Sequence, residues 1–164
     1  MTALTVVRAG LVALAIVALG FVPEVSVANP PSATGHGDFT PTGPGNDNQL
    51  RTISFSAIQR PNGKVAGQAE VHNRTTGVVV HMDIDCLNFP DPNTPNMVAF
   101  SGKVTNPPAL AGQTFTFLAK DNGEGSNSPP DELSGPFPVA CSGSFNVEMF
   151  PIQNGNIQVR PAAD

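Results

Sequence analysis

Residues 53–84, ISFSAIQRPNGKVAGQAEVHNRTTGVVVHMDI, decide the fold of this chain of 164 residues. Apolar and polar residues alternate there in three runs, which are separated by residues 60–64 and 73–77. The first separator holds Pro-Asn-Gly, in which proline presets φ and Asn-Gly accepts the left-handed backbone of a tight hairpin loop. We therefore expect a three-stranded antiparallel meander.

Each of the two loops sets the register of one strand pair. The first loop places Phe55 opposite Ala69, and for the second loop we expect His72 opposite Gly77. Under both registers the apolar side chains share one face of the sheet and the polar side chains share the other. This division is typical of an antiparallel sheet with one face buried and one face in water.

The same alternation recurs later in the chain, around residues 98–105, 114–120, 132–137, 144–149 and 157–159. Loops rich in Pro, Gly and Asn separate these runs. Beyond the amino end, no window carries apolar residues at helical spacing over three turns. About seven to eight short strands predict an all-β fold, either an antiparallel sandwich or a small barrel.

The amino end has the pattern of a Sec-type signal peptide over residues 1–28. Arg8 is followed by an apolar run at residues 9–22 and by the small-residue cleavage pattern Ser-Val-Ala at 26–28. The run is short for a membrane span, so we expect a secreted mature chain without one. Residues 29–49, which include His36, predict a flexible Pro/Gly-rich leader to a single domain at residues 50–164.

The charge pattern limits the partners of the chain. The formal net charge is −5, and the eight Lys and Arg residues are scattered singly, which argues against nucleic acid as a partner. Trp and Tyr are both absent, which weakens a carbohydrate-stacking hypothesis. The expected partner is an unknown extracellular or cell-envelope component.

The two cysteines, Cys86 and Cys141, both lie in the part of the chain expected to be exported. In an oxidising compartment they predict a disulfide, and closing a loop of this length stabilises a fold by about 4 kcal/mol on the chain-entropy model. The alternative is a pair of buried free thiols. Neither cysteine belongs to a Cys-x-x-Cys motif, so the sequence gives no support to a redox or zinc site.

Several phrases occur together in this chain, namely FSA at 55–57, RTTGVVVH at 74–81, FSG at 100–102, FTF at 115–117, DNGEG at 121–125 and GNIQV at 155–159. In them the chain resembles the post-COAP type of secreted bacterial module, over about residues 53–159. The resemblance implies an exported all-β module. It implies no activity and no catalytic residues, because the family is largely uncharacterised.

The loop at residues 121–132, DNGEGSNSPPDE, is the first candidate site. It offers carboxylate, amide and backbone oxygens, which are the ligands that Ca²⁺ prefers. The two prolines preclude the helix that would follow in an EF-hand, so we consider a structural calcium site of another kind or a plain acidic surface loop. The candidate ligands are Asp121, Asn122, Glu124, Asp131 and Glu132.

The polar face of the meander is the second candidate. It gathers Glu70, His72, His81 and Asp83, and the expected register places His81 diagonal to Glu70. Histidine titrates near neutrality, so this cluster suits a metal site or an acid–base pair. The alternative is a solvated outer face with ordinary cross-strand pairs.

No nucleophile elbow, His-Glu-x-x-His motif, phosphate loop or dinucleotide fingerprint occurs in the sequence. The favoured hypothesis is therefore a secreted non-enzymatic β module with a binding or structural role, which calcium can stabilise. The alternative is a small barrel enzyme or ligand carrier that uses the polar face. The two hypotheses differ in which face of the sheet points inward.

Overall fold

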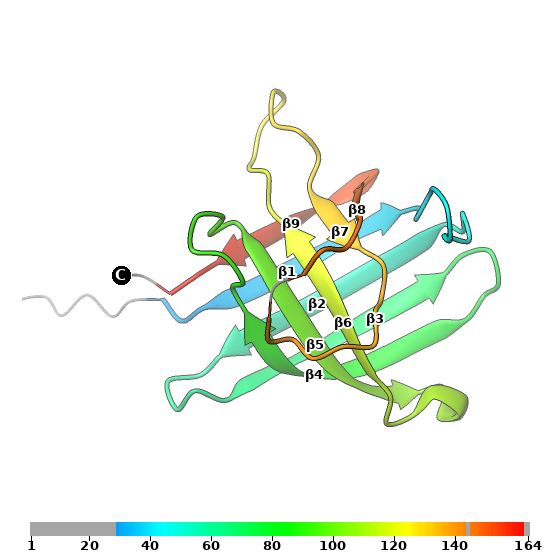
Figure 1. Ribbon diagram of the computed structural model, residues 1–164, viewed down its shortest axis with the longest axis horizontal. Helices are drawn as coiled ribbons and strands as arrows, with labels where there is room; N and C mark the ends of the chain where they lie inside the picture. The colour runs from blue at the N-terminus through cyan, green and yellow to red at the C-terminus, as the bar shows by residue number, and fades with distance from the viewer. Residues whose placement is uncertain (1–28, 144, 163–164) are drawn as a thin grey trace, which may run out of the picture.

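The computed structural model describes residues 29–143 and 145–162, and its nine antiparallel strands form one sheet (Figure 1). The order across the sheet is β8-β7-β6-β5-β4-β3-β2-β1-β9. The all-β prediction is confirmed, with slightly more strands than expected and no α-helix in the described residues. The strands are β1 (Ser32–Phe39), β2 (Arg51–Gln59), β3 (Val65–Asn73), β4 (Val79–Asn88), β5 (Met97–Asn106), β6 (Thr114–Lys120), β7 (Glu132–Ser134), β8 (Met149–Pro151) and β9 (Asn154–Arg160).

The sheet curls into a half-barrel. In Figure 1, β5 and β6 cross in front of β1, β2 and β3 instead of continuing beside them in one plane. The pairing of β4 with β5 shifts twice, between His81 and Met82 and between Ile84 and Cys86. Such bulges bend a strand and increase its twist, which explains why the sheet turns over at β4.

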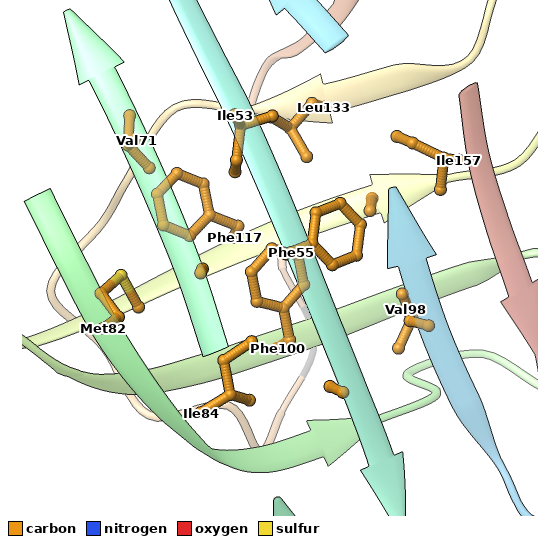
Figure 2. Packing of buried hydrophobic residues seen from close by; sticks show 14 of the residues in the cluster. Ile53, Phe55, Val71, Met82, Ile84, Val98, Phe100, Phe117, Leu133 and Ile157 are labelled. Carbon is orange, nitrogen blue, oxygen red and sulfur yellow. The ribbon is translucent and has the colours of Figure 1, made fainter. Parts of the chain in front are cut away.

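Apolar side chains fill the inside of this curl. Phe55, Phe100 and Phe117 stack on one another, with ring centroids 4.4 Å apart for the first pair and 5.4 Å apart for the second (Figure 2). Met82 and Ile84 of β4 are also buried. The apolar face of the meander therefore points inward, and its polar face points to solvent.

The first hairpin register is confirmed, because Phe55 pairs with Ala69. The expected register of the second hairpin is wrong by two residues, since His72 pairs with Val79 and not with Gly77. Asn73 closes the longer loop: its N–H donates to the carbonyl of Val78. Because the error is an even number of residues, every side chain keeps its predicted face.

The expectation of a flexible leader at residues 29–49 is wrong for Ser32–Phe39, which forms β1 between β2 and β9. The inner face of β1 is Ala33, Gly35, Gly37 and Phe39, and the two glycines conceal the apolar alternation. An added Cβ at Gly35 would lie 2.7 Å from the ring of Phe55, so a larger residue there would force the core side chains to move. The expected signal peptide lies outside the described residues.

A segment that we call the strap, residues 135–143 and 145–148, lies between β7 and β8 in the chain and crosses the outer face of β5 and β6 (Figure 1). It covers a second apolar cluster, in which Phe137 and Phe145 pack against Ala99 and Leu118. The expected strand at residues 144–149 is wrong for residues 145–148, which belong to the strap, and Met149 begins β8, while Ser144 lies outside the described residues.

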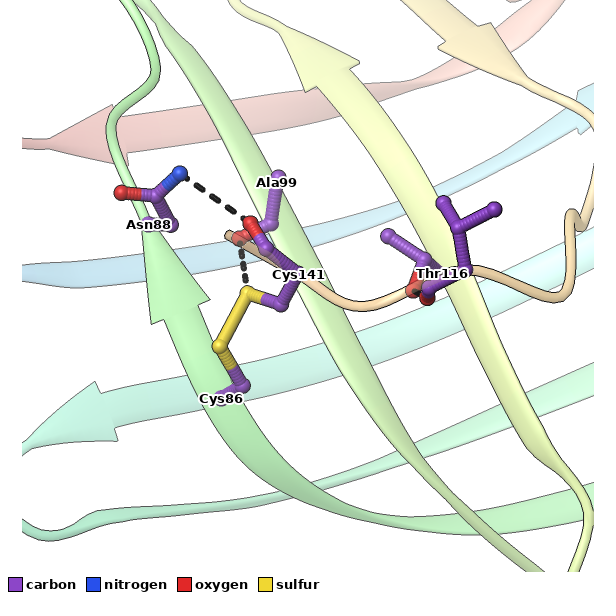
Figure 3. Close-up of a disulfide and its surroundings, with 6 residues drawn as sticks. Cys86, Asn88, Ala99, Thr116 and Cys141 are labelled. Atoms are coloured by element: carbon purple, nitrogen blue, oxygen red, sulfur yellow. Dashed lines mark hydrogen bonds between the residues drawn. A yellow bond between two sulfur atoms is a disulfide. The ribbon is translucent and has the colours of Figure 1, made fainter. Parts of the chain in front are cut away.

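The predicted disulfide joins Cys86 of β4 to Cys141 of the strap, with their Cα atoms 6.1 Å apart (Figure 3). Asn88 adds a hydrogen bond, since its Nδ2 donates to the carbonyl of Cys141 at 3.0 Å. The Thr116 hydroxyl donates to the carbonyl of Val139 at 2.5 Å. The strap is thus fixed to β4 by a covalent bond and to β6 by hydrogen bonds.

Candidate functional site

The acidic loop, residues 121–132, lies beside β9, the last strand of the sheet. β9 pairs with β1 along one edge, and the loop borders its other edge, which has no strand partner in the described residues. Asp131 is 7% exposed and its two carboxylate oxygens accept two backbone N–H groups, that of Asn122 at 2.8 Å and that of Ile157 at 2.7 Å. Asp121 accepts the N–H of Gly123 at 2.8 Å and that of Val159 at 3.1 Å. The two carboxylates therefore serve as acceptors for β9 in place of a neighbouring strand.

The other three candidate ligands of the loop, Asn122, Glu124 and Glu132, also have protein partners. Glu124 accepts a hydrogen bond from Asn156 Nδ2 at 2.9 Å, and Glu132 accepts one from Lys120 Nζ at 3.0 Å. Asn122 Nδ2 donates to the carbonyl of Pro130 at 2.7 Å. These contacts give the five candidate residues a structural role that the sequence did not reveal, because it depends on β9 lying next to the loop.

The calcium hypothesis stays a prediction. Among residues 29–143 and 145–162, no group of three or more His, Cys, Asp and Glu side chains is placed to hold a metal ion. The carboxylates of the loop instead accept hydrogen bonds from N–H groups of the protein. The fit to a metal therefore rests on the residue types of the loop alone.

The polar face brings Glu70 and His81 together. They lie directly opposite on β3 and β4, with Glu70 Oε2 3.4 Å from His81 Nδ1, and both side chains are about half exposed. The expected diagonal relation is thus corrected by the two-residue shift in register. His72 is not part of this pair, since its Nδ1 lies 2.9 Å from a guanidinium nitrogen of Arg74.

The remaining members of this face extend it over five strands. Asp83 lies opposite Gln68 on β3 and opposite Lys103 on β5. His36, which the sequence placed in a leader, is paired with Ser54 across β1 and β2. The sequence carried only a weak signal for His36: Thr34, His36 and Asp38 alternate with the inward residues of β1, but two of those inward residues are glycine.

A hollow of about 400 Å³ lies on this face over β2, β3 and β4, and we call it the polar groove. Its polar lining consists of Ser54, Ser56, Gln68, Glu70, His81, Asp83 and Thr105. The hollow exists because the serine side chains of β2 are short, and the longer side chains of β3 and β4 form its walls.

The groups of the polar groove are mostly free of protein partners. Within the part of the chain that the structure describes, the side chains of Ser54, Ser56, Gln68 and Asp83 are exposed to solvent and make no hydrogen bond to another protein group. Among the described residues, no serine or threonine hydroxyl is hydrogen-bonded to the imidazole of His81, whose partner is Glu70. The arrangement of the groove is suited to holding a polar ligand.

Two carboxyl groups outside the polar groove, those of Asp47 and Asp91, have lowered pKa values. Hydrogen bonds from the Arg51 guanidinium, at 2.5 Å and 2.9 Å, hold the pKa of Asp47 below its usual value. The pKa of Asp91 is also lowered, chiefly because its carboxylate accepts the backbone N–H of Asn93 at 2.8 Å. Both groups stabilise loops and neither lines the polar groove.

In residues 29–143 and 145–162, no helix is both long enough and apolar enough to cross a membrane. Comparison with known proteins gives no further assignment: no family model, no curated protein and no solved structure matches this chain. The resemblance to the post-COAP type of module therefore stays a prediction.

Proposed function

We propose that this chain is an exported, non-enzymatic β module that binds a small organic cation in the polar groove. One observation carries the proposal: the groove gathers polar side chains without protein partners, whereas the carboxylates of the acidic loop all have such partners. The polar side chains of the groove are exposed, so water satisfies them in the free protein and a ligand that enters the hollow can replace that water.

The charges of the groove indicate the class of ligand. Glu70 and Asp83 supply two negative charges, and no Lys or Arg belongs to the lining, although Lys103 lies opposite Asp83 across the sheet. Hydroxyl and amide oxygens of Ser54, Ser56 and Gln68 add further acceptors. A ligand with ammonium or guanidinium N–H donors satisfies these acceptors, and the net charge of −5 attracts it over a longer range.

Export is supported by the signal-peptide pattern of residues 1–28 and by the disulfide between Cys86 and Cys141, since such bonds persist in oxidising compartments. The resemblance to a secreted bacterial module favours the same location. Stabilisation by calcium at the acidic loop is a separate part of the hypothesis, and the groove does not depend on it.

The experiment is an NMR titration of the mature chain with spermidine, with glucose as a neutral comparison. We expect spermidine to shift the amide signals of β2, β3 and β4 around Ser54, Gln68 and His81, and glucose to leave them unchanged. The double substitution Glu70→Gln and Asp83→Asn should weaken binding by about tenfold or more, because it removes both charges.

The matched control is Asp85→Asn, which removes a charge from the exposed side of the same strand outside the groove. It should leave spermidine binding within about twofold of the parent. The proposal is overturned if spermidine shifts no signal at millimolar concentration, or if Asp85→Asn weakens binding as much as the double substitution does.

A further inference from the structure

A second hollow opens at the end of the half-barrel where the hairpin loop between β3 and β4 lies. Its volume is about 260 Å³, and it is bounded by the inner faces of β3 and β4 on one side and by β6 on the other. We call it the apolar mouth, and its side chains are Val71, Val78, Val80, Met82, Phe115 and Phe117, with Pro136 of the strap beside them.

The apolar mouth is continuous with the core. Met82 and Phe117 form its floor and are each 1% exposed, whereas Val78 at its entrance is 46% exposed. Val80 and Phe115, between floor and entrance, are partly buried and pack against the core. The stacked phenylalanines fill the interior beyond this floor, so the mouth is a shallow pocket and not the opening of a hollow barrel.

The polar groups at the rim already have partners. The Arg51 guanidinium pairs with Asp47, and one of its nitrogens also donates to the carbonyl of Gln49 at 3.1 Å. Asn73 donates to the side chain of Gln49, and its Oδ1 accepts the N–H groups of Thr75 and Thr76 at 3.0 Å each. The rim therefore offers no unpaired charge to a ligand.

We infer that the apolar mouth is a binding site for a neutral, compact apolar molecule of the size of a single aromatic ring. The volume is below the range of pockets for drug-sized ligands, about 300–1,000 Å³, so the ligand is small. The paired rim disfavours a charged ligand, because entry would bury its charge without a counter-ion. A bound apolar ligand would cover Val78 and Phe115, and the burial of this apolar surface lowers the free energy of the complex.

This site is independent of the polar groove. The side chains of Val80 and Met82 are half-buried and buried on the inner face of β4, whereas those of His81 and Asp83 are exposed on its outer face. Met82 borders both hollows, so the other lining residues tell them apart. Either site can bind its ligand when the other does not. A single titration monitored at both faces of β4 therefore tests the two proposals separately.

The test is methyl NMR of the mature chain, labelled at valine and methionine, with toluene as the probe and benzoate as a charged analogue. We expect toluene to shift the methyl signals of Val71, Val78, Val80 and Met82 and to leave those of Val98 unchanged. Val98 is a fully buried core residue that does not line the mouth. Benzoate should bind at least about tenfold more weakly than toluene.

Val78→Trp places a ring in the entrance and should weaken toluene binding by about tenfold or more. The matched control is Ile58→Trp, at another β-branched residue that is 41% exposed and lies outside the mouth, and it should stay within about twofold of the parent. Val78→Lys, which adds a charge at the entrance, serves if Val78→Trp does not fold. The inference is overturned if toluene shifts no mouth methyl up to its solubility limit, if benzoate binds equally well, or if the Val78 variants bind like the parent.

Discussion

Asp131 Oδ2 accepts the backbone N–H of Ile157 at 2.7 Å, while the other oxygen of the same carboxylate accepts the N–H of Asn122. One buried side chain thus joins the start of the acidic loop to β9, on the edge of β9 that faces away from β1. Loss of one acceptor leaves a donor unsatisfied at a site with little access to water, which is costly.

We expect Asp131→Asn to lower the free energy of unfolding by about 1–3 kcal/mol, because the amide presents an N–H₂ group to one of the two donors. Urea denaturation measures this change. Glu132→Gln is the control, since Glu132 is only half-buried and its partner is the Lys120 ammonium. Its effect should stay below about 1 kcal/mol, and equal losses in the two variants would contradict a special role for Asp131.

The calcium hypothesis predicts a higher Tm for the mature chain in excess Ca²⁺ than in chelator. Binding to the folded state alone adds RT ln(1 + [L]/Kd), which is about 2.7 kcal/mol at a ligand concentration of 100 Kd. The difference should vanish in the variant Asp121→Ala, Glu124→Ala. Coincident melts of the parent protein in Ca²⁺ and chelator would leave the loop with its structural role only.

The glycines of β1 explain both how the strand fits and why the sequence concealed it. At Gly37 an added Cβ would lie 2.7 Å from the carbonyl oxygen of Asn154 and would also clash with Ile152. We expect Gly37→Ala to destabilise the fold by about 1–3 kcal/mol through overpacking. Gly135→Ala is the control, because nothing lies within 4 Å of an added Cβ there, and thermal melts compare the two.

The strand faces could be predicted from the sequence, whereas β1 and the role of Asp131 could not. Faces followed from a period of two, which holds wherever inward positions are apolar, as at Phe55, Val71 and Met82. The sequence pattern did not predict β1, because two of its inward positions are glycine. Hydrophobic alternation depends on apolar side chains, and it cannot recognise an inward position at which the core leaves no room for one. The role of Asp131 was beyond the sequence, since it depends on the curl of the sheet that brings β9 beside residue 131.

The disulfide should matter chiefly for the strap. Cys86→Ser with Cys141→Ser removes a cross-link between residues 55 apart, for which the chain-entropy model gives about 4 kcal/mol. We expect amide hydrogen exchange to rise in the strap more than in β2 and β3, because the strap is held by separate hydrogen bonds to Thr116 and Asn88 and not by a continuous strand ladder. Uniform loss of protection over the whole sheet would contradict this local role.

The Asp47–Arg51 pair predicts a small dependence of stability on pH. Because hydrogen bonds from Arg51 lower the pKa of Asp47 in the folded protein, its contribution to stability is complete above the ordinary carboxyl pKa of 3.8 and is lost as the pH falls through the folded-state pKa. The Asp47 side chain is 41% exposed, so the contribution should be below about 1 kcal/mol. An NMR titration should find the pKa of Asp47 below 3.8, and Arg51→Gln should raise it while leaving that of Asp91 unchanged, since the backbone of Asn93 lowers the latter. An Asp47 pKa that does not respond to Arg51→Gln would show that another group holds the carboxylate ionised.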